Sequence, residues 1–253
     1  MTHLFSGEVA LVTGGGSGIG RTTAIAFASQ GARVVVAGRR AHECAETIRL
    51  IEEAGGVGHS VPTDVSNSGE VDALIENTIA RFGQLNFAFN NAGVEGTGFL
   101  PLTKYSEATW DQVVDTNLKG VFLCMKYQLP YIVATGGAIV NMASVAGLVG
   151  GRLGAAYYAS KHGVVGLTKA AAMEYASKGV RINAVAPAVI PTPMTERTFF
   201  HDATLTERLI GMHPMGRFGT ADEVADAVLW LCSKGASFTT GHVLPIDGGF
   251  VVP

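Results

Sequence analysis

Tyr157 and Lys161 are the two residues whose types and spacing point most directly to chemistry. They lie four positions apart at the start of an Ala-rich helical pattern, and side chains four apart share one helix face. A phenol with an ordinary pKa of about 10 is a poor base near neutral pH, and an adjacent ammonium group lowers that pKa by favouring the phenolate. The pair could therefore exchange a proton with a substrate oxygen. A plain surface contact is the alternative.

Polar side chains also follow two strand-like runs upstream of this pair. Ser144 follows the apolar run 138–142, and Asn91-Ala92-Gly93 follows the run 85–89. Parallel strands end at one edge of a sheet, where ligands bind, so we expect these residues to lie close together. Asn117 is a polar residue within an otherwise apolar helical face. The structural alternatives are a strand-end cap for Ser144 and a core amide with satisfied hydrogen bonds for Asn117.

A glycine-rich loop connects the first strand-like run to a helical pattern. Its sequence is Thr13-Gly14-Gly15-Gly16-Ser17-Gly18-Ile19-Gly20. Bare glycine lets the backbone approach a pyrophosphate, whose charge is stabilised by the free N–H groups and the dipole at a helix start. The order strand, loop, helix is the context that a dinucleotide-binding motif requires. A glycine-rich turn that binds no nucleotide is the alternative.

Two further segments concern the adenosine half of such a cofactor. The second strand-like run ends at Gly38-Arg39-Arg40, without the acid that holds the ribose in many dinucleotide sites. Glycine leaves space and arginine supplies bidentate donors for a 2′-phosphate, which favours NADP(H) while NAD(H) stays possible. The alternative places both arginines in solvent at a helix start. Asp64, beside Val65, could accept from the adenine amino group or could cap the helix that begins near Ser68.

The elements that must position these residues alternate along the chain. Apolar runs typical of parallel strands buried on both faces occur at 9–13, 33–37, 85–89, 138–142 and 180–185. Helical patterns lie at 18–30, 41–54, 68–82, 107–130, 155–178 and 221–233. This alternation predicts an α/β fold, a single Rossmann-type doubly wound parallel sheet flanked by helices, in one domain over 1–253. The Pro-, Thr-, Phe- and Met-rich stretch 188–216 interrupts the pattern and is a candidate substrate lid.

Composition and charge exclude several other classes of protein. The net charge is −3 and the longest basic block is Arg39-Arg40, so we expect no nucleic-acid binding. The longest uncharged stretch, 127–152, combines Gly, Pro and Asn as no lipid-facing helix would, so we expect no membrane span. The histidines are scattered and the cysteines, Cys44, Cys124 and Cys232, are widely spaced, so we predict no metal site. An odd cysteine count without a visible secretory signal favours the cytoplasm.

In their order and separations, these motifs make the sequence similar to the short-chain dehydrogenase/reductase family over nearly its whole length. The matching pieces are Thr-Gly-x-x-x-Gly-x-Gly at 13–20, Asn-Asn-Ala-Gly at 90–93, Asn117, Ser144, Tyr157-x-x-x-Lys161, Pro187 and Thr192. The resemblance implies an NAD(P)-dependent oxidoreductase that interconverts a ketone and a secondary alcohol by hydride transfer.

The resemblance also implies a role for each matching residue. Tyr157 would be the acid or base at the substrate oxygen, and Lys161 would hold the nicotinamide ribose and depress the pKa of Tyr157. Ser144 would hydrogen-bond the reacting oxygen, and Asn117 would hold a water in a proton relay to Lys161. Further cofactor contacts are implied at Gly14, Ser17, Gly18, Ile19, Gly20, Asn91, Ala92, Gly93, Pro187, Ile190 and Thr192.

One position departs from the family pattern. The usual Pro-Gly after the sixth strand is Pro187-Ala188 here, and Ala restricts φ where Gly is free. The resemblance therefore does not determine the path of the loop 188–192. Thr192 could also serve structurally, as an N-cap before Pro193.

The expected substrate pocket is mostly apolar. Its walls come from 94–100, 145–154 and 193–213, where charged residues are few. Such a pocket favours a small, neutral, apolar ketone or secondary alcohol. A 3-oxoacyl-[acyl-carrier-protein] reductase is the alternative within the family, but an acidic carrier protein needs a basic surface, and 127–137 is uncharged. The alternative outside the enzymes is a cofactor-binding scaffold or redox sensor. Such a protein would not need Tyr157 as a proton donor.

Composition also predicts association of identical chains. Only 15% of the residues are charged, and the last residues, 242–253, are largely apolar. The helical patterns 107–130 and 155–178 carry more apolar surface than one sheet can cover. Related family members pair these helices, so we expect a homotetramer with closed two-fold symmetry.

Overall fold

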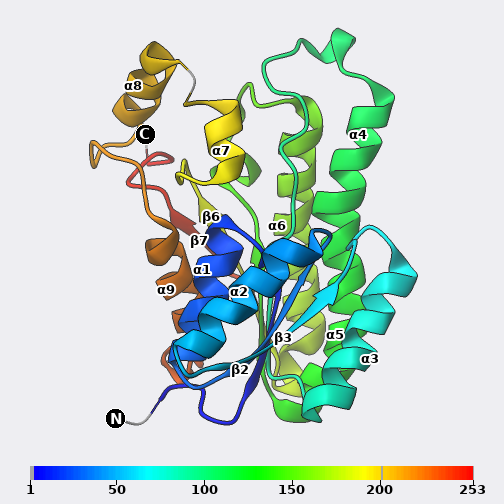
Figure 1. Ribbon diagram of the computed structural model, residues 1–253. Helices are drawn as coiled ribbons and strands as arrows, with labels where there is room; N and C mark the ends of the chain where they lie inside the picture. The colour runs from blue at the N-terminus through cyan, green and yellow to red at the C-terminus, as the bar shows by residue number, and fades with distance from the viewer. Residues whose placement is uncertain (1–2, 201, 253) are drawn as a thin grey trace.

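Seven parallel strands form one sheet in the order β3-β2-β1-β4-β5-β6-β7 (Figure 1). The structure is a computed structural model that describes residues 3–200 and 202–252. The strands are β1 Val9–Thr13, β2 Arg33–Gly38, β3 Val57–Pro62, β4 Phe87–Asn90, β5 Ala138–Met142, β6 Arg181–Pro187 and β7 Val243–Ile246. The predicted Rossmann-type parallel sheet is confirmed.

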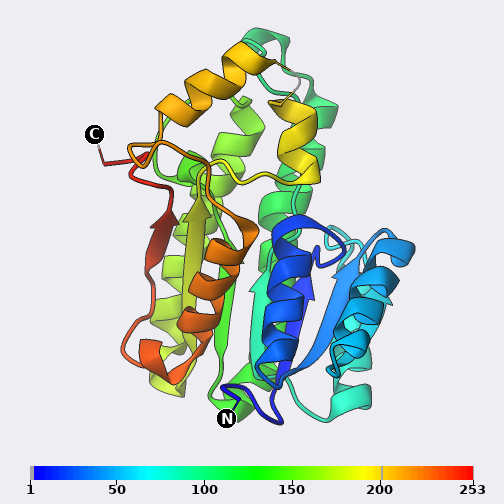
Figure 2. The ribbon, with the colours of Figure 1, turned by 60° about the vertical axis from the view of Figure 1, so that its left-hand side comes forward.

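Helices cover both faces of this sheet. They are α1 Gly18–Ser29, α2 Ala41–Glu53, α3 Ser68–Phe82, α4 Glu107–Val114, α5 Gly120–Thr135, α6 Ala155–Tyr175, α7 Pro193–Thr198, α8 Ala203–Gly211 and α9 Ala221–Cys232. Short 3₁₀ turns occur at Leu102–Lys104, Val145–Gly147, Ala176–Lys178 and Lys234–Ala236. Helices α1, α2 and α9 pack on one face, and α3, α5 and α6 pack on the other (Figures 1 and 2).

Strand β1 shows why these runs are apolar throughout. All five of its residues are buried. Ala10 and Val12 pack in the core with α1 and α9, whereas Val9 and Leu11 pack in the core with α3 and α5. Because helices cover both faces of the sheet, side chains on either face of the strand pack against apolar residues. The strand therefore has an apolar sequence without alternating polar positions.

The order of the strands reverses between β1 and β4. The chain moves from β1 through β2 to β3 on one side and from β4 through β5 to β7 on the other. In such sheets the crevice at the carboxyl ends of the strands beside this reversal is the usual ligand site. The short helices α7 and α8 lie beyond these strand ends (Figure 2). The fold therefore gathers the ends of β1, β4 and β5 beneath the stretch 188–216.

The structure differs from the expected single helix over 107–130. Helix α4 ends at Val114, a π-helical turn spans Asp115–Lys119, and α5 continues to Thr135 with Pro130 inside it. Such π-turns insert a residue into a helix and occur frequently at functional sites. Across 3–200 and 202–252, no helix is long and apolar enough to cross a membrane, and no three His, Cys, Asp or Glu side chains converge as metal ligands would.

Candidate active site

A cavity of about 310 Å³ lies where the strand-end loops meet α7. Its lining includes every residue that the sequence assigned to the cofactor, namely Gly14, Ser17, Gly18, Ile19, Gly20, Arg39, Arg40, Asp64, Val65, Asn91, Ala92, Gly93, Tyr157, Lys161, Pro187, Ile190 and Thr192. Ser144 lines the same cavity, whereas Asn117 is not part of its lining. Residues spread over most of the chain are thus brought to one site.

The glycine loop is shaped for close approach of a ligand. Gly14 and Gly18 have φ of 64° and 50°, a left-handed conformation that side chains disfavour. A Cβ on Gly20 would overlap the carbonyl oxygen of Gly14. Ser17 precedes α1 without making a side-chain cap hydrogen bond, so the N–H groups of the first turn stay available for an anion. This cradle fits the pyrophosphate of a dinucleotide.

Asn91 holds the glycine loop against β4. Its side-chain Nδ2 donates to the carbonyl oxygens of Thr13 at 3.0 Å and Gly14 at 3.2 Å, and its backbone N–H donates to the Thr13 hydroxyl at 3.0 Å. A Cβ on Gly14 would lie only 2.8 Å from Asn91 Nδ2. Asn91 therefore lines the cavity and also braces the backbone that shapes it.

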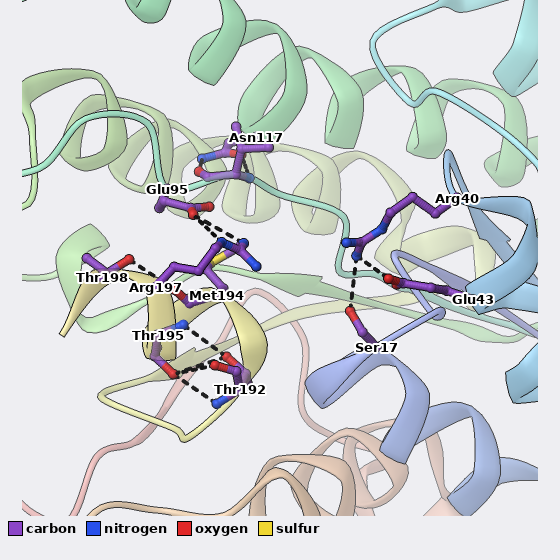
Figure 3. A network of polar contacts seen from close by, with 11 residues as sticks. Ser17, Arg40, Glu43, Glu95, Asn117, Thr192, Met194, Thr195, Arg197 and Thr198 are labelled. Atoms are coloured by element: carbon purple, nitrogen blue, oxygen red, sulfur yellow. Dashed lines mark hydrogen bonds and ion pairs between the residues drawn. The ribbon is translucent and has the colours of Figure 1, made fainter. Parts of the chain in front are cut away.

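The two arginines at the adenosine end have different surroundings. Arg40 forms an ion pair with Glu43 at 2.8 Å and donates to the Ser17 hydroxyl at 3.4 Å (Figure 3). Arg39 is exposed and lines the cavity without an ion pair to any residue in the described part of the chain. No motif in the sequence singled out Glu43, although an acid in the first helical turn after Arg40 is visible there. Its carboxylate partly neutralises Arg40 and leaves Arg39 as the more available cation.

Asp64 is fixed by its own loop and does not cap α3. Its Oδ1 accepts from the Ser66 backbone N–H at 3.0 Å and the Ser66 hydroxyl at 2.7 Å. Burial acts to raise the pKa of Asp64, but these hydrogen bonds and the charge of Arg39 outweigh it and hold the pKa below its usual value. The N-cap of α3 is Asn67, so the alternative of Asp64 as the cap is wrong. Its carboxylate is ionised and faces the cavity.

Tyr157 and Lys161 lie on the first turns of α6 with their side chains together. The Lys161 Nζ is 5.6 Å from the centroid of the Tyr157 ring. The lysine is only 3% exposed, and its Nζ donates to the carbonyl oxygen of Met142 at 2.8 Å. Burial disfavours the ammonium and lowers the pKa of Lys161 to about 8. A buried cation therefore lies beside the phenol at the cavity wall.

The protonation equilibrium of Tyr157 differs from the expectation. Burial raises the pKa of Tyr157 above its ordinary value, and the polar Ser144 hydroxyl only partly opposes this. The lowering of this pKa by Lys161 stays a prediction; the Lys161 Nζ lies 5.6 Å from the ring centroid and donates to the Met142 carbonyl. The phenol is thus held in its protonated form, ready to donate.

Ser144 and Asn117 both have the structural roles that the sequence left open, a cap at a strand end and a core amide with satisfied hydrogen bonds. The Ser144 hydroxyl accepts from the Ala146 N–H at 3.1 Å, which caps the turn Val145–Gly147, and it also faces the cavity. The fully buried Asn117 accepts from the Val94 N–H at 2.8 Å and donates to the Val94 carbonyl at 2.9 Å. Asn117 therefore holds the backbone of Val94 at the cavity wall, and its proton relay stays a prediction.

The loop after β6 needs no glycine at position 188. Among the described residues other than glycine, Phe99 alone has a positive φ, so Ala188 adopts an ordinary conformation. Its N–H donates to Ile246 of β7 at 3.2 Å. Thr192 caps α7 in a capping box with Thr195 while also lining the cavity (Figure 3). The departure from Pro-Gly leaves this loop unstrained.

Comparisons with known proteins match almost the whole chain. The family model described as enoyl-(acyl carrier protein) reductase matches residues 14–251. The 2,5-dichloro-2,5-cyclohexadiene-1,4-diol dehydrogenase of Sphingobium indicum is 44% identical over 247 residues, 97% of each chain. A cyclohexanol dehydrogenase from an Acinetobacter species is 42% identical over 251 residues, 99% of this chain and 97% of the relative.

Similarity in three dimensions is equally extensive. The crystal structure of levodione reductase superposes with a TM-score of 0.94 at 39% identity, covering 97% of this chain and 98% of that one. Sequence and fold therefore match these relatives over almost the full length. The chain belongs to the short-chain dehydrogenase/reductase family.

Proposed function

We propose that this oxidoreductase interconverts a small, neutral cyclic secondary alcohol and its ketone, with NADP(H) favoured over NAD(H). The observation that carries the proposal is that Ser144, Tyr157 and Lys161 line the same cavity as the glycine loop. The relatives named above act on ring alcohols or ketones according to their names. The stretch 188–216 would act as the lid over this substrate.

The residues of the chain divide the chemistry among them. The bound nicotinamide would supply or accept the hydride, because hydride transfer belongs to the cofactor. The Ser144 and Tyr157 hydroxyls would hold the substrate oxygen. In the reducing direction the Tyr157 hydroxyl gives its proton to that oxygen as the carbonyl carbon becomes C–H, and in the oxidising direction the phenolate removes the alcohol proton. Lys161 would stabilise that phenolate and bind the cofactor ribose.

A spectrophotometric assay tests the proposed function. Purified protein is mixed with cyclohexanol and oxidised cofactor, or with cyclohexanone and reduced cofactor, and absorbance is followed at the wavelength of the reduced nicotinamide. We expect turnover in both directions. Absence of turnover with a panel of ring alcohols and ketones and with both cofactors would contradict the proposal and favour a binding scaffold or sensor.

A reductase for acyl groups on a carrier protein is the second candidate. It is favoured by the description of the matching family model. A carrier-bound acyl chain would need a channel and a basic docking surface. The same assay with a 3-oxoacyl thioester as substrate separates the candidates. Preference for the thioester over cyclohexanone by kcat/KM would select the acyl reductase.

Cofactor preference rests on Gly38 and Arg39. Replacing Arg39 by Ala should raise the KM for NADP(H) by about tenfold, the value of one charge-assisted hydrogen bond, and should change the KM for NAD(H) little. Gly38→Asp should favour NAD(H), because a carboxylate accepts from a ribose hydroxyl and repels a phosphate. Steady-state kinetics with both cofactors would measure these changes.

Gly38→Ala is the matched control for the carboxylate. A Cβ at Gly38 would lie 3.1 Å from the Sγ of Cys44, so the methyl group alone tests crowding without charge. We expect the cofactor preference to change in Gly38→Asp and to stay the same in Gly38→Ala. Equal changes for both cofactors in Arg39→Ala would mean that this arginine lies in solvent and does not read the phosphate.

We also propose that the protein is a cytoplasmic homotetramer. The proposed assembly is supported by apolar side chains that the fold leaves exposed. Phe122 on α5 is 47% exposed and Met173 on α6 is 83% exposed, and such side chains on neighbouring helices are typical of an interface. Light scattering at low micromolar concentration should give about four times the chain mass of 26.3 kDa.

Phe122→Asp should reduce that mass, and removal of 250–253 should weaken assembly. Val57→Asp is the matched control, since Val57 is similarly exposed but lies on the edge strand β3. A fully active wild-type protein with the mass of a single chain would contradict the tetramer.

A further inference from the structure

An ion pair joins two distant segments at the reacting end of the cavity. Glu95, in the loop after β4, accepts from Arg197 of α7, with Oε1 3.2 Å from Nη2 and 3.4 Å from Nε (Figure 3). Both side chains line the cavity that contains Ser144 and Tyr157. The pair therefore connects the wall of the site to the helix that covers it.

The reacting end of the cavity lining combines apolar side chains with hydroxyl groups. The apolar residues are Val94, Ala143, Ala188, Ile190 and Met194, and the hydroxyl groups are those of Ser144, Tyr157, Thr192 and Thr195. The other charged residues in the described lining are Lys161 beside Tyr157 and, at the adenosine end, Arg39, Arg40, Glu43 and Asp64. Glu95 and Tyr157 line the same cavity, and the negative charge of Glu95 acts to raise the pKa of Tyr157. A substrate held at Tyr157 would thus be near the charge of Glu95.

The pairing decides how the site would treat a charged substrate. Arg197 is a possible partner for a substrate carboxylate, because a guanidinium binds carboxylates with two parallel hydrogen bonds. Here the Arg197 guanidinium donates to Glu95, and the negative charge of Glu95 would repel the carboxylate of a substrate. An uncharged ring alcohol meets neither obstacle. The pair is partly exposed, with side-chain exposures of 58% for Arg197 and 31% for Glu95, so its geometric hold on α7 is weak.

We propose that Glu95 determines substrate specificity by pairing with Arg197, so that the site accepts uncharged cyclic alcohols and rejects those that carry a carboxylate. This inference rests on the proposed function. It predicts that removing the charge of Glu95 frees Arg197 to bind an anionic substrate. If the ion pair only held α7 in place, breaking it would change kcat/KM equally for all substrates.

The test compares kcat/KM for cyclohexanol and for 4-hydroxycyclohexanecarboxylate. Glu95→Gln keeps the size of the side chain and should increase the ratio of carboxylate to neutral substrate by about tenfold, the value of one charge-assisted hydrogen bond. Arg197→Gln should not increase that ratio, and the double variant should lose the gain. Glu46→Gln, which breaks an exposed ion pair with Arg49 on α2, is the matched control and should leave the ratio unchanged.

Each outcome decides between the explanations. If Glu95→Gln oxidises cyclohexanol with an unchanged ratio of kcat/KM for carboxylate to neutral substrate, the specificity inference is wrong but the proposed function stands. Equal losses for both substrates in Glu95→Gln and Arg197→Gln would do the same, and would assign the pair to holding α7. Wild-type preference for the carboxylate also overturns it. If the wild-type protein oxidises neither alcohol with either cofactor, the proposed function itself is wrong and this inference falls with it.

Discussion

Replacing Tyr157 by Phe should lower kcat by about 10²–10⁴-fold, the usual value of one general acid, with little change in cofactor affinity. The change removes a single oxygen and leaves the ring beside Lys161. Among the cavity-lining residues, Tyr157 carries a titratable hydroxyl, and the Ser144 hydroxyl lines the same cavity. Without the Tyr157 hydroxyl, no group at this position can give a proton to a ketone oxygen.

Tyr158→Phe is the matched control for this variant. The Tyr158 hydroxyl packs against Gly151, where an added Cβ would overlap it, and Tyr158 is not part of the described cavity lining. We expect this control to retain activity within a few fold, on the order of other non-catalytic substitutions. Steady-state kinetics and fluorescence titration of the cofactor would measure both variants. More than about a tenth of wild-type turnover in Tyr157→Phe would contradict its role as the acid.

Replacing Lys161 by Met should remove turnover and yet stabilise the cofactor-free protein at pH 7. Burial lowers the pKa of Lys161 from 10.5 to about 8, which corresponds to about 3.5 kcal/mol of unfavourable folding energy at about 1.4 kcal/mol per unit. Methionine avoids that cost but leaves the Met142 carbonyl without its donor, at about 1–3 kcal/mol. The expected net gain in the free energy of unfolding is therefore about 0.5–2.5 kcal/mol.

The dependence on pH identifies the origin of that gain. Below pH 8 the ammonium is charged in both the folded and the unfolded protein, so the full cost of burying it is present. Between pH 8 and 10.5 the unfolded chain holds the proton and the folded chain does not, so wild-type stability contributed by this group rises with pH. The advantage of Lys161→Met should therefore shrink, and finally reverse, as the pH approaches 10.

Urea unfolding of the cofactor-free protein at pH 7 and pH 10 measures this difference. Lys169→Met is the matched control, because Lys169 lies on the same helix but is exposed. The control should show no comparable change between the two pH values. A Lys161→Met protein that is less stable than wild type at pH 7 by several kcal/mol would mean that the buried lysine stabilises the fold through its hydrogen bond.

The sequence by itself determined the parallel sheet, with runs for five of its seven strands, most of the helices around it and the edge at which the site lies. Strands such as β1 are covered on both faces, and this coverage leaves a continuous apolar run that can be recognised without coordinates. The glycine loop is equally local, because its left-handed glycines and the helix start that follows are contiguous. Parallel strands with right-handed crossovers then place Ser144 and Tyr157 near that loop.

Only the tertiary structure decided how these residues interact. Arg40 is partly neutralised by Glu43, Asn117 is hydrogen-bonded to the Val94 backbone, and the π-turn at Asp115–Lys119 interrupts a pattern that looked helical throughout. The protonation of Tyr157 depends on burial more than on the lysine four residues away. Glu95 and Arg197 meet across 102 positions of sequence. Charge pairing and desolvation depend on distances between segments that are remote along the chain, and residue spacing encodes no such distances.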